Sequence, residues 1–283
     1  MKYKIPFLIL CSIFLFSCSN ENELKYNITT AQIPMQDNIH LAADIYWPTG
    51  YRKDDVYPVL LEYIPYRKDE SRGRNYPLYS YFLDNDYIVA RVDIRGTGNS
   101  EGKVIPNEYS DIELDDGEEV IEWLANQSWS NGKVGMFGIS WGGFNSIQMA
   151  MRNPPALKAF VAVMATEYLY EEDVHYIDGI MVAGDSWMMS NDLYNSLPGA
   201  PDFIMDEQWY EDRFDVEPSV YKYMRQQRDG PFWDRASAKN KYHLIKVPGY
   251  HIGGWYDGYR NSLPRMVENV SAPVKAMIGP WDH

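Results

Sequence analysis

The sequence contains very little cysteine. Among 283 residues only Cys11 and Cys18 occur, and both lie close to the N-terminus. Two cysteines in these positions supply neither a disulfide framework nor the Cys/His spacing of a zinc site. Apolar residues make up 45% of the chain, which is ample for one large core. We therefore expect a single large α/β domain that needs no metal and no organic cofactor.

Positive charge is scarce as well. The chain has 26 Lys and Arg against 40 Asp and Glu, so its formal net charge is -14. Nucleic acids and anionic membrane surfaces carry charge of the same sign and would repel such an exterior. The charge balance argues against both as partners and indicates an acidic, solvated surface.

No apolar run is long enough to form a permanent membrane-spanning helix. The run from Ile5 to Phe16 is short, and Lys2 and Lys4 precede it. A basic start followed by a short apolar run is typical of an export signal. We expect residues 1–17 to be a signal peptide and set them aside. A buried N-terminal helix is the alternative.

A lipid anchor is expected directly after this signal. Leu15-Phe16-Ser17-Cys18 resembles the lipobox of bacterial lipoproteins, in which the cysteine is lipidated after cleavage. Residues 18–30 would then be a tether between the lipid and the domain. The protein is expected to be an exported bacterial lipoprotein in the periplasm, at the outer membrane or on the cell surface. Its contact with membrane would run through Cys18 alone.

Segments rich in β-branched and aromatic residues alternate with helical or loop stretches along the chain. This alternation is expected of a sheet with crossover helices. Several segments are continuous apolar runs, as in buried parallel strands. The sequence thus predicts an α/β fold with a mostly parallel sheet and helices on both faces. The expected strands are residues 39–47, 58–64, 87–94, 133–139, 157–165, 246–253 and 273–278, and residues 111–126 suit a helix.

Residues 168–242 interrupt the series of strands. They are acidic and rich in Tyr, Trp and Met, and they are too long for an ordinary loop. We interpret them as an inserted helical cap between two parts of the core, residues 31–167 and 243–283. The large side chains of the cap either line a substrate cavity or form the cap's own packing. They are Met181, Trp187, Met188, Met189, Trp209 and Trp233.

A serine stands at the centre of the glycine-rich turn Gly138-Ile139-Ser140-Trp141-Gly142. A sharp strand-to-helix turn exposes a nucleophilic oxygen, but it needs small residues two positions before and after the serine. Gly138 and Gly142 meet this demand, and the flanking residues are typical of a strand and a helix. The turn predicts Ser140 as the nucleophile of a serine hydrolase with an α/β-hydrolase fold. An ordinary surface serine is the alternative.

An acid and then a base should follow the nucleophile, each after a later strand. Asp257 and His283 follow the last two expected strands in this order. Ligands of such sheets bind beyond the carboxyl ends of the strands, so both side chains are expected near Ser140. His283 would accept the serine proton, and Asp257 would orient His283. The alternatives are His251 and Asp282.

An oxyanion formed during acyl transfer needs two hydrogen-bond donors. The backbone N–H of Trp141 comes with the serine turn, and the second donor is expected after an early strand. Tyr66 follows the expected strand 58–64, so its hydroxyl is the candidate. An ordinary half-buried tyrosine is the alternative.

Together these residues resemble the CocE/NonD hydrolases, which include cocaine esterase and glutaryl-7-aminocephalosporanic acid acylase and are related to Xaa-Pro dipeptidyl-peptidases. The resemblance implies an α/β-hydrolase fold with the triad Ser140, Asp257 and His283, and an oxyanion hole made by Tyr66 and Trp141. It covers residues 33–283 and rests on six ordered matches. These are residues 35–44, 65–68, 93–102, 138–144, 254–257 and 279–283. The glycine-rich turn 93–102 lacks a Lys-Ser/Thr continuation, so we expect no nucleotide site there and expect Arg95 to brace it.

The chain departs from this family in two respects. Family members continue into a C-terminal β jelly-roll domain that is absent from these 283 residues, so the chain is expected to be truncated after His283. Related α-amino acid ester hydrolases hold the substrate ammonium with acids just after the aspartate of the triad, where this chain has Gly258-Tyr259-Arg260. This difference favours an acyl group like those of the esterase or the acylase.

The expected function is cleavage of an ester or amide bond in a small molecule or a short peptide, through an acyl-enzyme at Ser140. One alternative is an inactive, truncated fragment displayed as a lipoprotein, because loss of the base would remove several orders of magnitude in rate. The other is a sugar- or peptide-binding lipoprotein that uses the aromatic cap.

Overall fold

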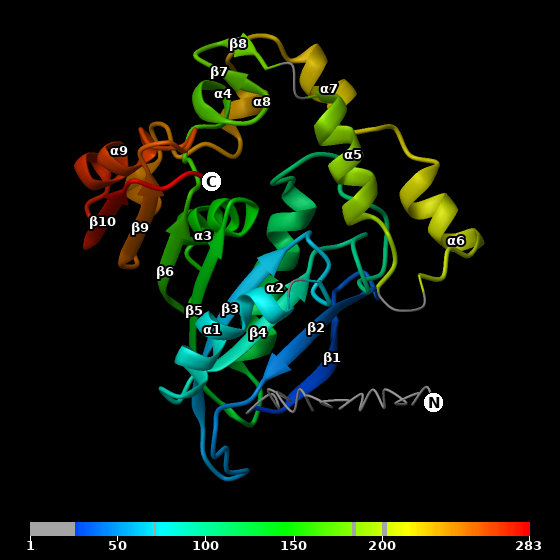
Figure 1. Cartoon of the computed structure of the whole chain (residues 1–283), viewed down its shortest axis with the longest axis vertical. Coiled ribbons are helices and arrows are strands. Elements are labelled where there is room, and N and C mark those ends of the chain that lie inside the picture. The colour runs from blue at the N-terminus through cyan, green and yellow to red at the C-terminus, as the bar shows by residue number, and fades with distance from the viewer. Residues whose placement is uncertain (1–25, 71, 183–184, 200–202) are drawn as a thin grey trace, which may run out of the picture.

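A computed structural model of the chain describes residues 26–70, 72–182, 185–199 and 203–283. Its centre is an eight-stranded sheet with the order β1-β2-β4-β3-β5-β6-β9-β10 (Figure 1). Strand β2 runs antiparallel to both of its neighbours, β1 and β4, and all other pairs are parallel. The strands are β1 (Ile28–Pro34), β2 (His40–Tyr46), β3 (Tyr57–Ile64), β4 (Ile88–Asp93), β5 (Ser130–Ile139), β6 (Leu157–Val163), β9 (Gly249–Gly254) and β10 (Val274–Gly279).

Every strand expected from the sequence overlaps one of these strands, and the structure adds β1. This strand begins at Ile28, inside the segment expected to be a tether, and pairs with β2 from Ile28 opposite Tyr46 to Pro34 opposite His40. It lies at the edge of the sheet, and Ile33 is its one fully buried side chain. An edge strand of this kind has little apolar alternation, which is why the sequence pattern did not reveal it.

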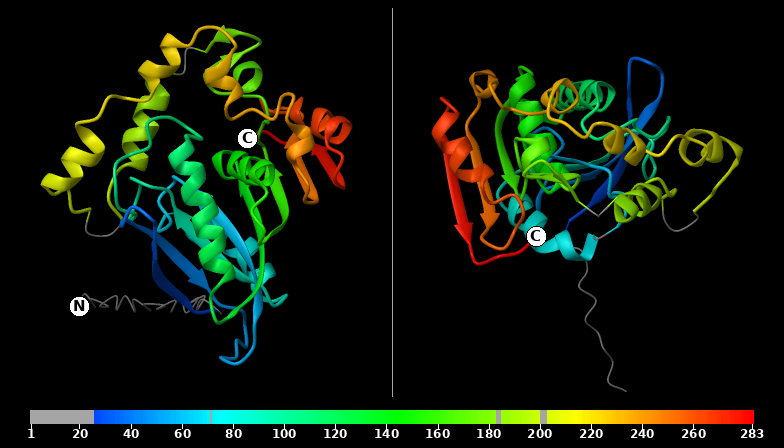
Figure 2. Two further views of the ribbon diagram at one scale, coloured as in Figure 1. Left: turned by 180° about the vertical axis from the view of Figure 1, so that it is seen from behind. Right: turned by 90° about the horizontal axis from the view of Figure 1, so that it is seen from above.

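Helices cover both faces of the sheet, as predicted. Helices α2 (Asp111–Ala125) and α3 (Trp141–Arg152) contact one face, and α1 (Arg72–Leu83) lies on the other (Figure 2). Side chains alternate between the two faces along a strand, so β4 contributes side chains to the core on both faces of the sheet. Its Ala90 belongs to the larger core under α2 and α3, whereas its neighbour Val89 packs under α1. The last helix, α9 (Ser262–Asn269), contacts β9 and β10.

The segment between β6 and β9 contains several short helices joined by loops, and it lies over one end of the sheet (Figure 1). Trp233 is buried in this segment among Tyr170, Tyr176 and Tyr223, and the Trp209 indole donates a hydrogen bond to the Ser196 carbonyl (2.7 Å). These two tryptophans therefore form the segment's own packing. The side chains of residues 183–189 lie outside the described part. The elements are α4 (Leu169–Glu172), β7 (Tyr176–Ile177), β8 (Ile180–Met181), α5 (Asp185–Asn195), α6 (Glu207–Trp209), η1 (Tyr210–Phe214), α7 (Val220–Arg225), α8 (Pro231–Asp234) and η2 (Tyr242–Leu244).

Arg95 braces the turn after β4, as expected. Its guanidinium forms two hydrogen bonds to Asp116 of α2 (2.6 and 2.7 Å) and one to Asp37 in the β1–β2 turn (2.6 Å). The Arg95 guanidinium thus links the turn after β4, helix α2 and the β1–β2 turn by charge-assisted hydrogen bonds.

No helix in the described ranges is both long enough and apolar enough to cross a membrane. The expected signal peptide, residues 1–17, and the expected lipidation site, Cys18, lie outside the described residues.

Candidate active site

Ser140 occupies a strained turn between β5 and α3. Its backbone has φ 55° and ψ -126°, a region that L-residues with a side chain rarely adopt. The turn is held from both sides, because the Ser140 N–H donates to the Val163 carbonyl (3.0 Å) and its carbonyl accepts from the Phe144 N–H (2.9 Å). The side chain is half-exposed at the tip. This geometry is that of a nucleophile elbow.

The glycines around Ser140 are required by close approach of the backbone. A Cβ at Gly138 would lie 2.5 Å from the Gly142 carbonyl carbon, and one at Gly142 would lie 2.9 Å from the Ile64 side chain. A Cβ at Gly143 would lie 2.8 Å from Ala165. The turn therefore cannot keep its shape with larger residues, which agrees with the sequence argument for Gly138 and Gly142.

Tyr66 and Trp141 lie together beside Ser140. The Trp141 backbone N–H donates to the Tyr66 hydroxyl at 3.3 Å, and both residues line the same small pocket as Ser140. Burial raises the pKa of Tyr66, so its hydroxyl stays protonated and can donate at neutral pH. Two donors converge next to the serine oxygen, the arrangement needed to bind an oxyanion.

Glu113 fixes the position of Trp141 from behind. This fully buried carboxylate from α2 accepts hydrogen bonds from the Trp141 indole N–H (2.7 Å), the Asn145 amide (3.0 Å) and the Tyr109 backbone N–H (2.6 Å). Burial raises the pKa of Glu113 to about 7, although these hydrogen bonds act in the opposite direction. Asn145 also donates to the carbonyl of Tyr63 (3.2 Å), near the end of the strand that leads to Tyr66.

Asp257 and His283 lie together after β9 and β10. His283 Nδ1 is 3.3 Å from Asp257 Oδ1, and Asp257 is buried while His283 is 46% exposed. Asp257 Oδ1 also accepts from the Tyr259 backbone N–H at 3.4 Å. A carboxylate that binds Nδ1 selects the imidazole tautomer whose Nε2 can accept a proton.

The segment that carries His283 is held by the loop after β9. Trp255 N–H donates to the Gly279 carbonyl (2.8 Å), and Tyr256 N–H donates to the Trp281 carbonyl (3.0 Å). Gly254 permits this approach, because a Cβ there would lie 2.0 Å from the Trp281 carbonyl oxygen. The histidine at the last residue of the sequence is thus positioned by residues that precede it.

The two groups of residues meet at Tyr259. Among the described residues, Ser140 lines a pocket with Tyr66 and the imidazole of His283 contacts Asp257, and no hydrogen bond joins Ser140 to His283. The Tyr259 ring meets His283 edge-on at 5.6 Å and lines the same small pocket as Ser140. Catalytic hydrogen bonds are often made only in the substrate complex.

The two alternatives from the sequence are placed less favourably. His251 is buried inside β9, where its ring packs edge-on against Phe160 and burial lowers its pKa to about 4. Asp282 is exposed, and the contact to His283 comes from Asp257 instead.

Three buried titratable residues near Ser140 were missed by the sequence analysis. Glu108 and Asp173 line the pocket of about 40 Å³ beside Ser140, and His175 Nε2 lies 3.0 Å from Glu108 Oε2. Asp173 Oδ2 is buried and accepts no hydrogen bond within the described ranges, and burial together with Glu108 raises the pKa of Asp173. Ligand atoms of the three residues lie within 4.8 Å of one another, so the cluster could accept a cation. Acidic residues were frequent in this part of the sequence, and nothing in their spacing marked these two.

The strand order and the elbow define the α/β-hydrolase fold. The chain belongs to the X-Pro dipeptidyl-peptidase (S15) family, whose model matches residues 37–283. The family is one of peptidases, and its relatives include esterases and other hydrolases.

Among curated proteins, cocaine esterase from Rhodococcus sp. (strain MB1 Bresler) is 28% identical over 289 residues, covering 92% of this chain and 49% of the esterase. A putative Xaa-Pro dipeptidyl-peptidase from Streptomyces avermitilis is 28% identical over 182 residues, covering 52% of this chain and 26% of that protein. The chain spans about half the length of the esterase.

Solved structures support the same fold. A CocE/NonD family hydrolase from Staphylococcus aureus superposes with a TM-score of 0.70 at 24% identity, covering 88% of this chain and 45% of the other. An α-amino acid ester hydrolase gives a TM-score of 0.67 at 23% identity, covering 92% and 48%.

Proposed function

We propose that this chain is the core of a serine hydrolase that cleaves ester or amide bonds through an acyl-enzyme at Ser140. The observation that carries the proposal is the elbow itself: a serine at φ 55° that shares a small pocket with Tyr66 and Trp141, where the Trp141 N–H lies 3.3 Å from the Tyr66 hydroxyl. A turn of this strain persists only when the surrounding structure enforces it, and such turns cluster at active sites.

The reaction would proceed in two steps, acylation and then deacylation of Ser140. The Ser140 oxygen bonds to the carbonyl carbon of the substrate and gives its proton to His283 Nε2, while Asp257 stabilises the resulting imidazolium. The carbonyl oxygen becomes an oxyanion held by the Trp141 N–H and the Tyr66 O–H. The intermediate then expels the leaving group, which takes the proton from His283. Water repeats the sequence on the acyl-enzyme and releases the acid and free Ser140.

The buried acids change what can be said about the substrate. Directly after Asp257 the sequence has Gly258-Tyr259-Arg260 and no acid to hold a substrate ammonium. Glu108 and Asp173 line the pocket beside Ser140 from other segments, and Asp173 Oδ2 has no hydrogen bond in the described part of the chain. The objection to an α-amino acyl substrate therefore does not hold for this geometry. Esters, amides and short peptides such as those in the names of the relatives all remain within the proposal.

Export and lipid attachment form a separate part of the proposal. They are supported by the short apolar run that ends in Leu15-Phe16-Ser17-Cys18. Globomycin, which blocks lipoprotein signal cleavage, should cause the unprocessed form to accumulate in a bacterial host. A protein that stays unlipidated, with an intact N-terminus, would contradict export and lipid attachment. The proposed hydrolase activity would be unaffected.

A fluorophosphonate probe tests the proposed nucleophile. The probe should form a covalent adduct, and trypsin should release it on the peptide Val134–Arg152, which contains Ser140 and Ser146. Ser146 is fully buried and bonded to the Gly142 carbonyl (2.8 Å), so fragmentation should place the adduct on Ser140. An adduct on another residue, or none at all in folded protein, would contradict the proposal.

Tyr66→Phe tests the oxyanion donor. The substitution keeps the ring and removes the hydroxyl, so kcat should fall about 10²–10³-fold, the effect of losing one such donor. KM for a small ester such as 4-nitrophenyl acetate should change little, because the oxyanion forms after binding. Tyr81→Phe, on the 65% exposed Tyr81 of α1, is the matched control. Equal kcat values for the Tyr66 variant and wild type would exclude this role.

A further inference from the structure

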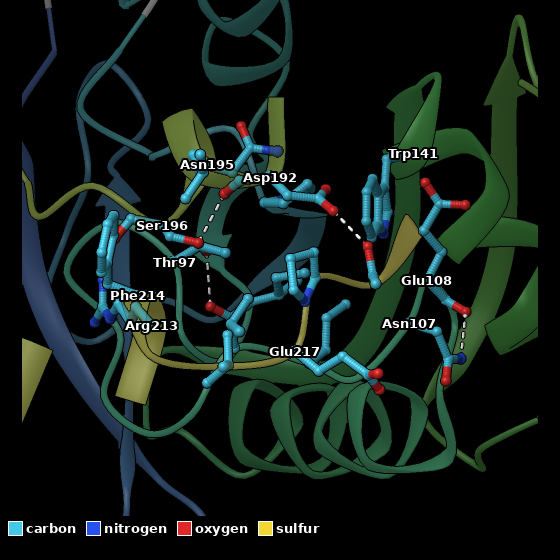
Figure 3. Close-up of a pocket in the computed structure, with 18 residues that line it drawn as sticks. Thr97, Asn107, Glu108, Trp141, Asp192, Asn195, Ser196, Arg213, Phe214 and Glu217 are labelled. Atoms are coloured by element: carbon cyan, nitrogen blue, oxygen red, sulfur yellow. Dashed lines mark hydrogen bonds between the residues drawn. The ribbon is translucent and has the colours of Figure 1, made fainter. Parts of the chain in front are cut away.

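A second cavity opens from the site, beneath the segment between β6 and β9. It has a volume of about 230 Å³ and lies between the loop Ile94–Glu108 and the segment Asp192–Ser219. Trp141 and Glu108 stand at one end, and Phe214 and Arg213 stand at the other (Figure 3). Resting on the proposed function, we infer that this cavity binds the acyl part of the substrate and takes an uncharged, apolar acyl group.

The cavity begins at the oxyanion hole. Trp141, whose backbone N–H is one oxyanion donor, lines both this cavity and the small pocket of Ser140, and so does Glu108. Pro65, the neighbour of Tyr66, also lines the cavity. A substrate with its carbonyl oxygen between Trp141 and Tyr66 can therefore extend one of its two ends into this space.

That end is the acyl group, because the leaving group must lie next to the base. The leaving atom takes its proton from His283 when the intermediate collapses. His283 is held by Asp257 and touches Tyr259, and none of residues 254–283 lines the cavity. The chain on the carbonyl carbon that points away from His283 is the acyl chain.

Apolar side chains provide the free wall of the cavity. They come from the β4 end and its following loop, and from the segment that covers the sheet. They include Ile94, Val104, Ile105, Phe214, Val216 and Pro218. Apolar surface of this kind favours an alkyl or aryl group over water.

The acids that line the cavity already have partners in the protein. Among the described lining residues, a ligand with a carboxylate at its end would meet three acids and no free cation. Burial of an unpaired carboxylate is costly. The pairs are Glu108 with His175 (3.0 Å), Asp192 with the Ser219 hydroxyl, and Glu217 with Arg225 (3.0 Å).

Arg213, the one cation among the described residues that line the cavity, is occupied as well. Its guanidinium donates to the backbone carbonyls of Gly98 (2.9 Å), Ser196 (3.2 Å) and Ser100. These bonds tie the segment above the sheet to the turn after β4. Arg213 therefore maintains the wall of the cavity and is not available to a substrate carboxylate.

A chain-length series of 4-nitrophenyl esters tests this inference. From acetate through butyrate to hexanoate, kcat/KM should rise by up to about fourfold for each added methylene, the ratio that corresponds to burial of a CH₂ group. The monoester of adipate has the length of hexanoate but ends in a carboxylate. Its kcat/KM should be at least about tenfold below that of hexanoate, because no free cation among the described lining residues can pair with the terminal carboxylate.

Val216 is the residue with which to fill or enlarge the cavity. It is half-buried in the loop before α7, lines the cavity and belongs to neither the proposed triad nor the proposed oxyanion hole. Val216→Trp should lower the ratio of hexanoate to acetate kcat/KM at least about tenfold, since the bulk removes the space for a chain. Val216→Ala should extend the preference to octanoate.

Val267→Trp is the matched control, since Val267 is 48% exposed on α9 and is not among the residues that line the cavity. Thermal melting should show that each variant is folded. If wild type hydrolyses acetate but gains nothing from longer chains, or if folded Val216→Trp leaves the ratio unchanged, the acyl cavity is refuted and the proposed function stands. If folded wild type hydrolyses no ester and takes no fluorophosphonate, both proposals fail.

Discussion

Replacing Ser140 with alanine should lower kcat for 4-nitrophenyl acetate by about 10⁶-fold, the loss seen when a triad serine is removed. The alanine keeps the small size that the turn demands but has no oxygen to form the acyl-enzyme. The covalent fluorophosphonate adduct should disappear with it. The oxyanion donors and the binding pocket stay in place, so a weak residual rate above that of water is expected.

Ser271→Ala is the matched control, because Ser271 is exposed between α9 and β10. It should keep both the activity and the label. Hydrolysis that persists in Ser140→Ala at more than about 1% of the wild-type rate would show that another group is the nucleophile, since a triad serine accounts for far more than two orders of magnitude.

The elbow was predictable because its demands are local. The turn needs a serine at positive φ and no Cβ at positions two residues away, and only a few residue types satisfy this steric condition. The observed contacts of Gly138 with Gly142, and of Gly142 with Ile64, are the physical form of that condition. The parallel strands were predictable for a related reason, since their apolar runs are continuous.

The residues that support the site were not predictable from the sequence. Glu113 appears in the sequence as one acid among several in the first turns of a helix. In the fold it is a buried acceptor for Trp141, Asn145 and Tyr109. Its role depends on the packing of α2 against α3, which brings together residues that are 28 and 32 positions apart. Periodicity reports which face of a helix is buried, but it does not report what that face meets.

The residues that line the cavity could not be predicted from the composition of the cap. Its large aromatic residues suggested either a cavity lining or internal packing, and Trp209 and Trp233 are packing. The cavity wall instead uses Phe214 and smaller residues, such as Val216 and Pro218, together with the loop after β4. A concave surface depends on which segments leave space between them, and composition alone carries no such information.

Asp257→Asn should lower kcat by about 10⁴-fold, as in serine hydrolases whose triad aspartate becomes an amide. The buried Asp257 accepts from His283 Nδ1 at 3.3 Å, and an asparagine of the same shape can present an N–H to that nitrogen. The imidazole would then carry its proton on Nε2 and could not accept one from Ser140. The ring would stay in place while its tautomer became wrong, so KM should change much less than kcat.

Asp282→Asn is the decisive control, because Asp282 precedes His283 directly and was the alternative acid in the sequence. It is exposed, so its loss should change kcat by no more than about twofold. Melting curves of both variants would separate a catalytic defect from unfolding. A folded Asp257 variant with near wild-type kcat, or an Asp282 variant with the larger loss, would move the acid of the triad to another residue. The expected result would instead show that the loop after β9, which also holds the Trp281 carbonyl through Tyr256, both positions and polarises the histidine at the end of the sequence.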